Sequence, residues 1–157
     1  MEKQKTGIVF SGGGTKSVAH AGVLKFLEEK NIQPDIFACC SGGSIVGSLY
    51  AAGKSPQEIL DFFKSIYFFN WKHFAFNQPG LVSSKIFRIY LEPIFGDMKI
   101  GDLQKEVRIV ATELVSGTQI IFGKEFKIID AIIASCSVPG VTTPYIIGEE
   151  LYSDAEF

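Results

Sequence analysis

The sequence predicts an α/β fold, a layered domain in which helices flank a mostly parallel central sheet. A short apolar run at residues 6–10 ends in a glycine-rich turn, and a helical pattern follows it through Lys30. The same order then repeats, with an apolar run at 36–40 leading into a small, apolar helix expected over 44–52. Because strands that alternate with helices are joined by crossovers, we expect them to run parallel.

The third predicted helix has the best-defined start in the chain. Ser55 is its expected N-cap, Pro56 suits the first helical position, and Glu58 completes an S-x-x-E capping box. A fourth helix is predicted over residues 83–95, where the pattern again favours a helix.

The second half of the chain contains a predicted hairpin. Two apolar runs, 107–114 and 119–122, lie on either side of Ser116 and Gly117, a pair that favours a tight turn. A last short strand is expected over 151–153. These strands complete the predicted sheet.

Length and composition predict one domain over residues 1–157. The 46% of hydrophobic residues are enough for a well-packed core, and no repeat or linker divides the chain. The net charge of −2, the pI near 5.7 and the scattered cationic residues give no broad basic field. Nucleic acid is therefore not an expected partner.

The cysteines and the apolar runs bear on the compartment. Cys39 and Cys40 are adjacent and Cys136 stands alone, which is neither an even disulfide framework nor a metal-ligand spacing. The N-terminal apolar stretch is too short for a signal peptide, and no run reaches the roughly 18 to 20 apolar residues that span a bilayer. We expect a cytoplasmic protein with any membrane contact peripheral.

Ser41 is the candidate nucleophile because it lies between an apolar strand and a helix, in the sequence Cys-Cys-Ser-Gly-Gly. A nucleophile elbow strains the serine backbone and needs small residues two positions before and after it. Gly43 meets this need, and Cys39 meets it in part. Cys40 is expected to be buried and inert and to point to the opposite side of the turn. Glycines that only pack a helix onto a sheet would give a similar pattern.

Three consecutive glycines, Gly12, Gly13 and Gly14, end the first strand and precede the first helix. Consecutive glycines let several backbone amides converge on one anion. The loop is therefore a candidate oxyanion hole, in which the amides would stabilise the charge that develops on an attacked carbonyl.

Nucleotide binding is the main alternative for this loop. A phosphate-binding P-loop would need glycine at Phe10 and Thr15, and a dinucleotide fingerprint would need a third glycine at Ser17. A tight turn without any ligand is a further alternative. The missing glycines make both nucleotide interpretations weak.

Asp154 is the candidate base. It follows the predicted strand 151–153, which would carry its carboxylate to the strand end beside Ser41. The two histidines, His20 and His73, lie far upstream of the aspartate, whereas the α/β-hydrolase order places histidine last. We expect both to be packed or surface residues. An aspartate after a strand is also a common turn residue.

Aromatic side chains crowd one short stretch. They could contact acyl chains or a membrane, or they could pack a helix connection at the edge of the core, which is the commoner role of such stretches. The residues are Tyr67, Phe68, Phe69, Trp71, Phe74 and Phe76.

Taken together, the motifs resemble the patatin-like phospholipase family over nearly the whole chain. They follow the family's order. Its glycine-rich segment corresponds to 11–14 with 20–24, and its elbow and following helix correspond to 41–47 with 49–53. The stretch that precedes its aspartate corresponds to 134–140, and its aspartate motif corresponds to 151–154. The resemblance implies a dyad of Ser41 and Asp154 without histidine, and a glycine-loop oxyanion hole. It also implies no metal or cofactor, and hydrolysis of acyl esters in phospholipids or other lipids.

The chain departs from the family pattern at several positions. Cys39 replaces the first elbow glycine, and Lys16 and Ser17 stand where the family commonly has Arg and Gly. Ala155 and Glu156 replace the glycines after the aspartate. If the backbone needs a positive φ at position 155, alanine would be less stable there than glycine by about 1 kcal/mol or more. These departures leave a second hypothesis, a catalytically degenerate lipid-binding module. Because the family continues beyond this point, we expect the domain to be cut short after the aspartate motif.

Overall fold

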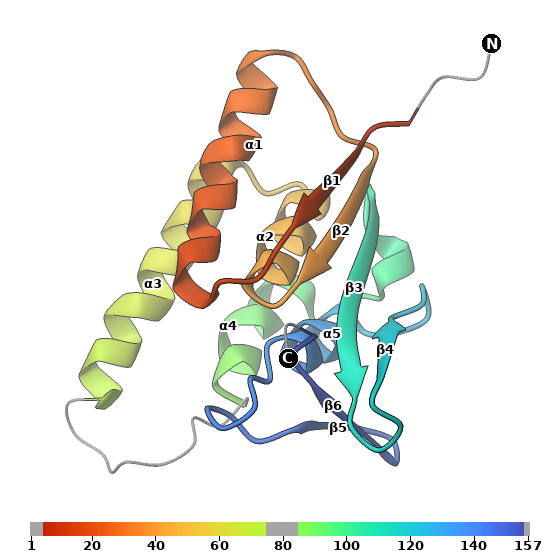
Figure 1. Cartoon of the computed structure of the whole chain (residues 1–157). Helices are drawn as coiled ribbons and strands as arrows, with labels where there is room; N and C mark the ends of the chain where they lie inside the picture. Colours follow the sequence, from red (N-terminus) through yellow and green to blue (C-terminus); the bar gives the residue numbers. More distant parts are fainter. Residues whose placement is uncertain (1–4, 75–84, 156–157) are drawn as a thin grey trace.

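The computed structural model describes the backbone of residues 5–74 and 85–155, and the side chains of 5–66 and 87–155. Its elements alternate strands and helices and then end in short strands (Figure 1). The first half contains β1 (Gly7–Phe10), η1 (Gly14–Val18), α1 (Ala19–Glu29), β2 (Ile36–Cys40), α2 (Gly42–Ala51) and α3 (Pro56–Phe74). The second half contains α4 (Lys85–Phe95), η2 (Ile100–Asp102), β3 (Glu106–Glu113), β4 (Thr118–Ile121), α5 (Ile128–Ser135), β5 (Tyr145–Ile147) and β6 (Glu150–Ser153).

The fold is α/β, as the sequence predicts, but the sheet is mixed rather than mostly parallel. β1, β2 and β3 run parallel, whereas β3 pairs antiparallel with both β4 and β6, and β5 pairs antiparallel with β6. The antiparallel hairpins follow from short connections, because a turn of a few residues can only reverse the chain. Gly117 and Gly148 have positive φ in these two turns, at 67° and 64°.

The strands β2 and β6 lie on the same edge of β3, and this places the candidate site. Val110 and Thr112 of β3 pair with β4 along one edge. On the other edge Val110 pairs with Cys40 of β2, and Thr112 pairs with Ser153 of β6. β6 therefore continues along β3 from the point where β2 ends, and the two strands approach each other head on.

Helices α2 and α5 pack on one face of the sheet, and the core lies between them and the strands (Figure 1). Residues of α2 from Gly42 to Leu49 are all buried. On the opposite face, Val9 of β1 and Arg108 of β3 are exposed. Both pair with Ala38 of β2, so the three residues form one row across the sheet. Within the described residues, helical packing thus covers one face of the sheet more than the other.

The structure contains one α-helix, α5, that the sequence analysis does not predict. The segment of α5, Ile128–Ser135, is buried at nearly every position, so its apolar residues show no helical stripe in the sequence. The capping box at Ser55 and Glu58 is present as predicted, with the Ser55 amide donating to Glu58 at 2.8 Å and the Glu58 amide donating to Ser55 Oγ at 3.2 Å. Local caps are readable from sequence, whereas a wholly buried helix is not.

Candidate active site

Ser41 occupies a strained turn between β2 and α2. Its φ and ψ are 49° and −131°, and among the described residues the only other non-glycine with positive φ is Asn31. Such a backbone costs about 1–3 kcal/mol for a residue with a Cβ, and it persists only where the surroundings enforce it. The side chain is 4% exposed, at the amino end of a buried helix. This is the geometry of a nucleophile elbow.

Two glycines after Ser41 let the strand, loop and helix pack tightly. A Cβ on Gly43 would lie 2.3 Å from the carbonyl oxygen of Phe10, which ends β1. A Cβ on Gly42 would lie 2.7 Å from the carbonyl oxygen of Gly14 and 2.5 Å from Ser17 Oγ. Both positions therefore exclude any side chain, since real Cβ atoms do not approach so closely. The elbow rests directly on the end of β1 and on the glycine loop.

Cys39, which stands in place of the family's first elbow glycine, is accommodated by a glycine elsewhere. Its side chain is 2% exposed, and a Cβ on Gly47 of α2 would lie 2.3 Å from its sulfur. The missing Cβ at Gly47 thus provides the space that the thiol fills. Burial raises the pKa of Cys39 to about 12, so the thiol stays protonated and serves as packing.

Asp154 lies at the end of β6, where the head-on approach of β2 and β6 brings it towards the elbow. Cys40 pairs with Val110 of β3, and Ser153 pairs with Thr112 of β3. The next residue after each of them, Ser41 and Asp154, therefore approaches the level of Ala111, which lies between those two β3 residues. Asp154 is 1% exposed, and its amide donates to the carbonyl of Ser137 at 2.9 Å. The sheet register thus places the two candidate residues at one point of its edge.

The expectation for Cys40 is wrong in its burial and in its direction. Its side chain is only half-buried, and its Sγ lies 3.7 Å from Oδ1 of Asp154, in position to donate a weak hydrogen bond. The thiol therefore points to the aspartate instead of away from the site. The reason is that β6 joins the edge of β3 immediately beyond Cys40, a strand order that local sequence does not reveal.

The glycine loop packs against the elbow. Gly13 and Gly14 have φ values of 140° and 55°, and a 3-10 turn begins at Gly14 before α1. Among the hydrogen bonds that link the described residues, none is donated by the backbone amides of Gly12 or Gly13. Amides beside a serine elbow that have no acceptor of their own are suited to bind an oxyanion.

Serines hold both backbone polar groups of Ser41. Its amide donates to Ser135 Oγ at 2.8 Å, and Ser135 Oγ in turn donates to the carbonyl of Val110 at 2.7 Å. Its carbonyl accepts from the amide of Ser44 at 2.8 Å and from Ser44 Oγ at 2.6 Å. Sequence reasoning missed Ser135 and Ser44 as parts of the site. The only available signal was that both lie within the motifs that resemble the family.

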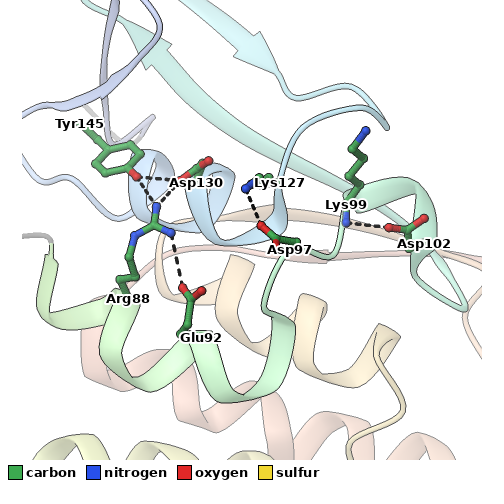
Figure 2. Close-up of polar contacts among 8 residues, drawn as sticks. All are labelled: Arg88, Glu92, Asp97, Lys99, Asp102, Lys127, Asp130 and Tyr145. Atoms are coloured by element: carbon green, nitrogen blue, oxygen red, sulfur yellow. Dashed lines mark hydrogen bonds and ion pairs between the residues drawn. The ribbon is translucent and has the colours of Figure 1, made fainter.

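A polar cluster fixes the hairpin that carries Asp154 (Figure 2). Arg88 of α4 donates to Asp130 of α5 and, at 2.6 Å, to the hydroxyl of Tyr145, which itself donates to Asp130 at 2.7 Å. Tyr145 begins β5 and pairs with Tyr152, two residues before the aspartate. Burial, followed by the bond to Asp130, raises the pKa of Tyr145, which keeps its hydroxyl protonated as a donor. Two helices thus hold this hairpin in place.

His20 has a packing role, as expected. Its ring stacks on Phe10 with centroids 4.7 Å apart, and Nε2 donates to the carbonyl of Ser11 at 3.0 Å in the tautomer that this contact favours. The side chains of His73 and of the aromatic stretch 67–76 lie outside the described residues, as does Glu156. Ala155 is described and does not have positive φ, so the strain considered there does not arise.

The described part of the chain lacks two kinds of feature, a metal-binding cluster and a membrane-spanning helix. No group of three or more His, Cys, Asp or Glu side chains in it is placed to hold a metal ion. No helix in it is long and apolar enough to cross a bilayer.

Comparison with known proteins identifies relatives of the chain. A relative from Caenorhabditis elegans, a patatin-like phospholipase domain-containing protein, is 30% identical over 119 residues, which is 71% of this chain and 11% of that protein. An NTE family protein of Mycobacterium tuberculosis is 27% identical over 150 residues, which is 94% of this chain and 26% of the relative. The chain thus spans about a quarter or less of the length of these two relatives.

Solved structures share the fold at low sequence identity. VipD from Legionella pneumophila matches with a TM-score of 0.67 and 14% identity, over 97% of this chain and 46% of that one. ExoU from Pseudomonas aeruginosa, solved as a complex with SpcU, matches with a TM-score of 0.61 and 19% identity, over 87% of this chain and 37% of that one. The family model described as patatin-like phospholipase matches residues 8–157, so this chain belongs to the patatin-like phospholipase family.

Proposed function

We propose that the chain is a serine lipid acyl hydrolase in which Ser41 is the nucleophile and Asp154 its base. The observation that carries the proposal is the strained elbow at Ser41, with φ of 49°, at the point where β6 brings in a buried carboxylate. Membership of the patatin-like phospholipase family supports a lipid substrate, and the acyl esters of phospholipids or other lipids are the proposed class.

The first half-reaction forms an acyl-enzyme. Ser41 Oγ bonds to the ester carbonyl carbon while its proton passes to Asp154, and the carbonyl oxygen takes the negative charge. The bond to the alcohol then breaks, and the alcohol leaves with the proton from the aspartate. In the second half-reaction, water gives a proton to Asp154 and attacks the acyl carbon. The proton returns to Ser41 as the fatty acid leaves.

Backbone amides of Gly12, Gly13 and Gly14 form the proposed oxyanion hole in both half-reactions. Their position against the elbow, at Gly42, supports this role. The amide of Ser41 is already bonded to Ser135 and is not available as a donor. The loss of one oxyanion donor typically costs about 10²- to 10³-fold in rate.

Ester hydrolysis and active-site labelling test the proposal. The wild type, Ser41→Ala and Asp154→Asn are assayed with short-chain p-nitrophenyl esters and with phospholipid vesicles, and each is treated with a fluorophosphonate probe. We expect each substitution to lower kcat by at least about 10³-fold, because removal of one member of a catalytic unit nearly abolishes its effect. The probe should modify Ser41 in the wild type only.

Ser48→Ala is the matched control, because Ser48 is a fully buried serine on α2, and the hydroxyl it would lose has no hydrogen-bond partner among the described residues. This variant should hydrolyse esters and take up the probe like the wild type. A folded wild type that neither reacts with the probe nor hydrolyses any ester would favour the degenerate lipid-binding module. Activity that survives in both Ser41→Ala and Asp154→Asn would exclude the dyad.

A further inference from the structure

Ser135 connects the elbow to the sheet through a chain of two hydrogen bonds. The amide of Ser41 donates to Ser135 Oγ at 2.8 Å, and that hydroxyl donates to the carbonyl of Val110 at 2.7 Å. Ser135 is 0% exposed, at the last residue of α5. Because its single proton is directed at Val110, the oxygen lone pairs of the hydroxyl face Ser41. Its direction as an acceptor is therefore fixed.

The position of this contact is significant because the β2–β3 ladder ends there. Cys40 and Val110 form the last pair between these two strands, and the chain turns into its strained conformation at Ser41. The Ser135 hydroxyl connects the first amide beyond this ladder, that of Ser41, to Val110, the last residue of β3 that pairs with β2. Without it, the buried amide of Ser41 would have no acceptor in its present orientation, which is unfavourable for a buried donor.

The carbonyl side of the same residue is held independently. Ser44 donates to the Ser41 carbonyl through both its amide and its hydroxyl. The peptide groups on both sides of the Ser41 Cα are thus fixed, while the side chain stays free to react. Loss of the Ser135 contact would release the amide side and let φ relax towards ordinary negative values.

We propose that Ser135 is a positioning residue for the nucleophile: its buried hydroxyl accepts the Ser41 amide and so holds the elbow in the reactive conformation. The proposal rests on the proposed function of Ser41. It concerns the orientation of the nucleophile and not the binding of substrate, so it predicts an effect on kcat and on probe labelling while KM changes little.

Ser135→Ala is compared with Ser135→Thr, which retains a hydroxyl, and with Ile132→Val. Ile132 is fully buried on the same helix, and its truncation to valine lowers stability by about as much as the loss of one hydrogen bond. Rates are expressed per folded protein. We expect Ser135→Ala to lower kcat and the fluorophosphonate labelling rate about tenfold or more, from the loss of one buried bond. Ser135→Thr should be faster than Ser135→Ala, and Ile132→Val should match the wild type.

Hydrogen exchange at the Ser41 amide provides a readout that does not depend on catalysis. Exchange should be about tenfold faster in Ser135→Ala, since a lost bond of about 1.4 kcal/mol corresponds to that factor. It should be unchanged in Ile132→Val. If the wild type fails to label but exchange changes as expected, the proposed function fails and the positioning contact stands.

Three results would overturn the positioning role. The first is a wild-type labelling rate and wild-type amide exchange in folded Ser135→Ala. The second is an equal loss of labelling in Ile132→Val, which would assign the effect to stability alone. The third is a Ser135→Thr variant that labels no faster than Ser135→Ala.

Discussion

The sulfur of Cys40 lies 3.7 Å from Oδ1 of Asp154, although the two residues are separated by 114 positions in the sequence. This contact exists because β2 and β6 meet head on along the edge of β3. It makes the half-buried Cys40 a reporter of the site. Any group attached to its sulfur would lie against the proposed base.

Iodoacetamide should therefore modify Cys40 selectively in the folded protein at pH 8. Burial raises the pKa of both Cys39 and Cys136 to about 12, so only about 10⁻⁴ of either thiol is ionised and reactive at that pH. Peptide mapping by mass spectrometry should find one modified thiol, and ester hydrolysis should fall in proportion to its modification.

Cys40→Ala is the control for this labelling and should leave the folded protein unmodified. Rapid modification of Cys39 or Cys136 under native conditions would contradict the buried positions assigned to them.

The strain at Ser41 predicts a difference in stability between two inactive variants. Ser41→Gly and Ser41→Ala both remove the hydroxyl, but only glycine adopts the φ of 49° and ψ of −131° without strain. We expect Ser41→Gly to be more stable than Ser41→Ala by about 1 kcal/mol. Glycine relieves the backbone strain in the folded state, and the greater conformational entropy that it gives to the unfolded chain offsets part of this gain. Urea unfolding measures the difference.

The same pair of substitutions at Ser48 serves as the control, because Ser48 lies within the regular helix α2. There glycine should be less stable than alanine by about 1 kcal/mol. If the glycine variant were less stable than the alanine variant at position 41 as well as at position 48, the result would contradict a strained elbow.

Much of the site's local structure was predictable because it depends on neighbouring residues. The elbow needs small residues around Ser41, and the structure gives the reason, since a Cβ on Gly42 or Gly43 would overlap backbone atoms of the loop or of β1. The start of α3 follows from Ser55 and Glu58, which are three residues apart. Such short-range patterns are visible in one sequence.

The parts that escaped prediction depend on contacts between distant segments. No local pattern shows that β6 would pair antiparallel with the end of β3, which makes the sheet mixed and turns Cys40 towards Asp154. α5 was missed because it is buried on all sides. The role of Ser135 escaped notice for both reasons, since it ends that helix and its partners are Ser41 and Val110.

Gly43→Ala should damage both folding and activity. The added Cβ would lie 2.3 Å from the Phe10 carbonyl oxygen and 2.6 Å from that of Ser11, and backbone atoms at the end of β1 cannot move aside as a flexible side chain could. We expect a loss of at least about 2 kcal/mol in the free energy of unfolding and a displaced nucleophile. Urea unfolding and fluorophosphonate labelling measure the two effects.

Gly22→Ala is the matched control, because Gly22 lies on α1 with nothing within 4 Å of the added Cβ. It should stabilise the protein by up to about 1 kcal/mol through helix propensity and leave labelling unchanged. Similar stability of the two alanine variants would show that the elbow is less tightly packed than its contacts indicate.

The cap of α3 predicts a pH-dependent contribution to stability. Glu58 accepts from the Ser55 amide and hydroxyl and pairs with Lys54 at 3.0 Å, and these bonds, the Ser55 amide first, lower its pKa to about 2. The folded pKa lies below the unfolded value of 4.5, so the stabilisation is fully present above that value and is lost as the pH falls towards 2. Glu58→Gln should therefore be less stable than the wild type at pH 7, and urea unfolding should show this difference shrinking from pH 5 to pH 3. A difference for Glu58→Gln that stays constant across this range would mean that the charge of Glu58 does not contribute to the cap.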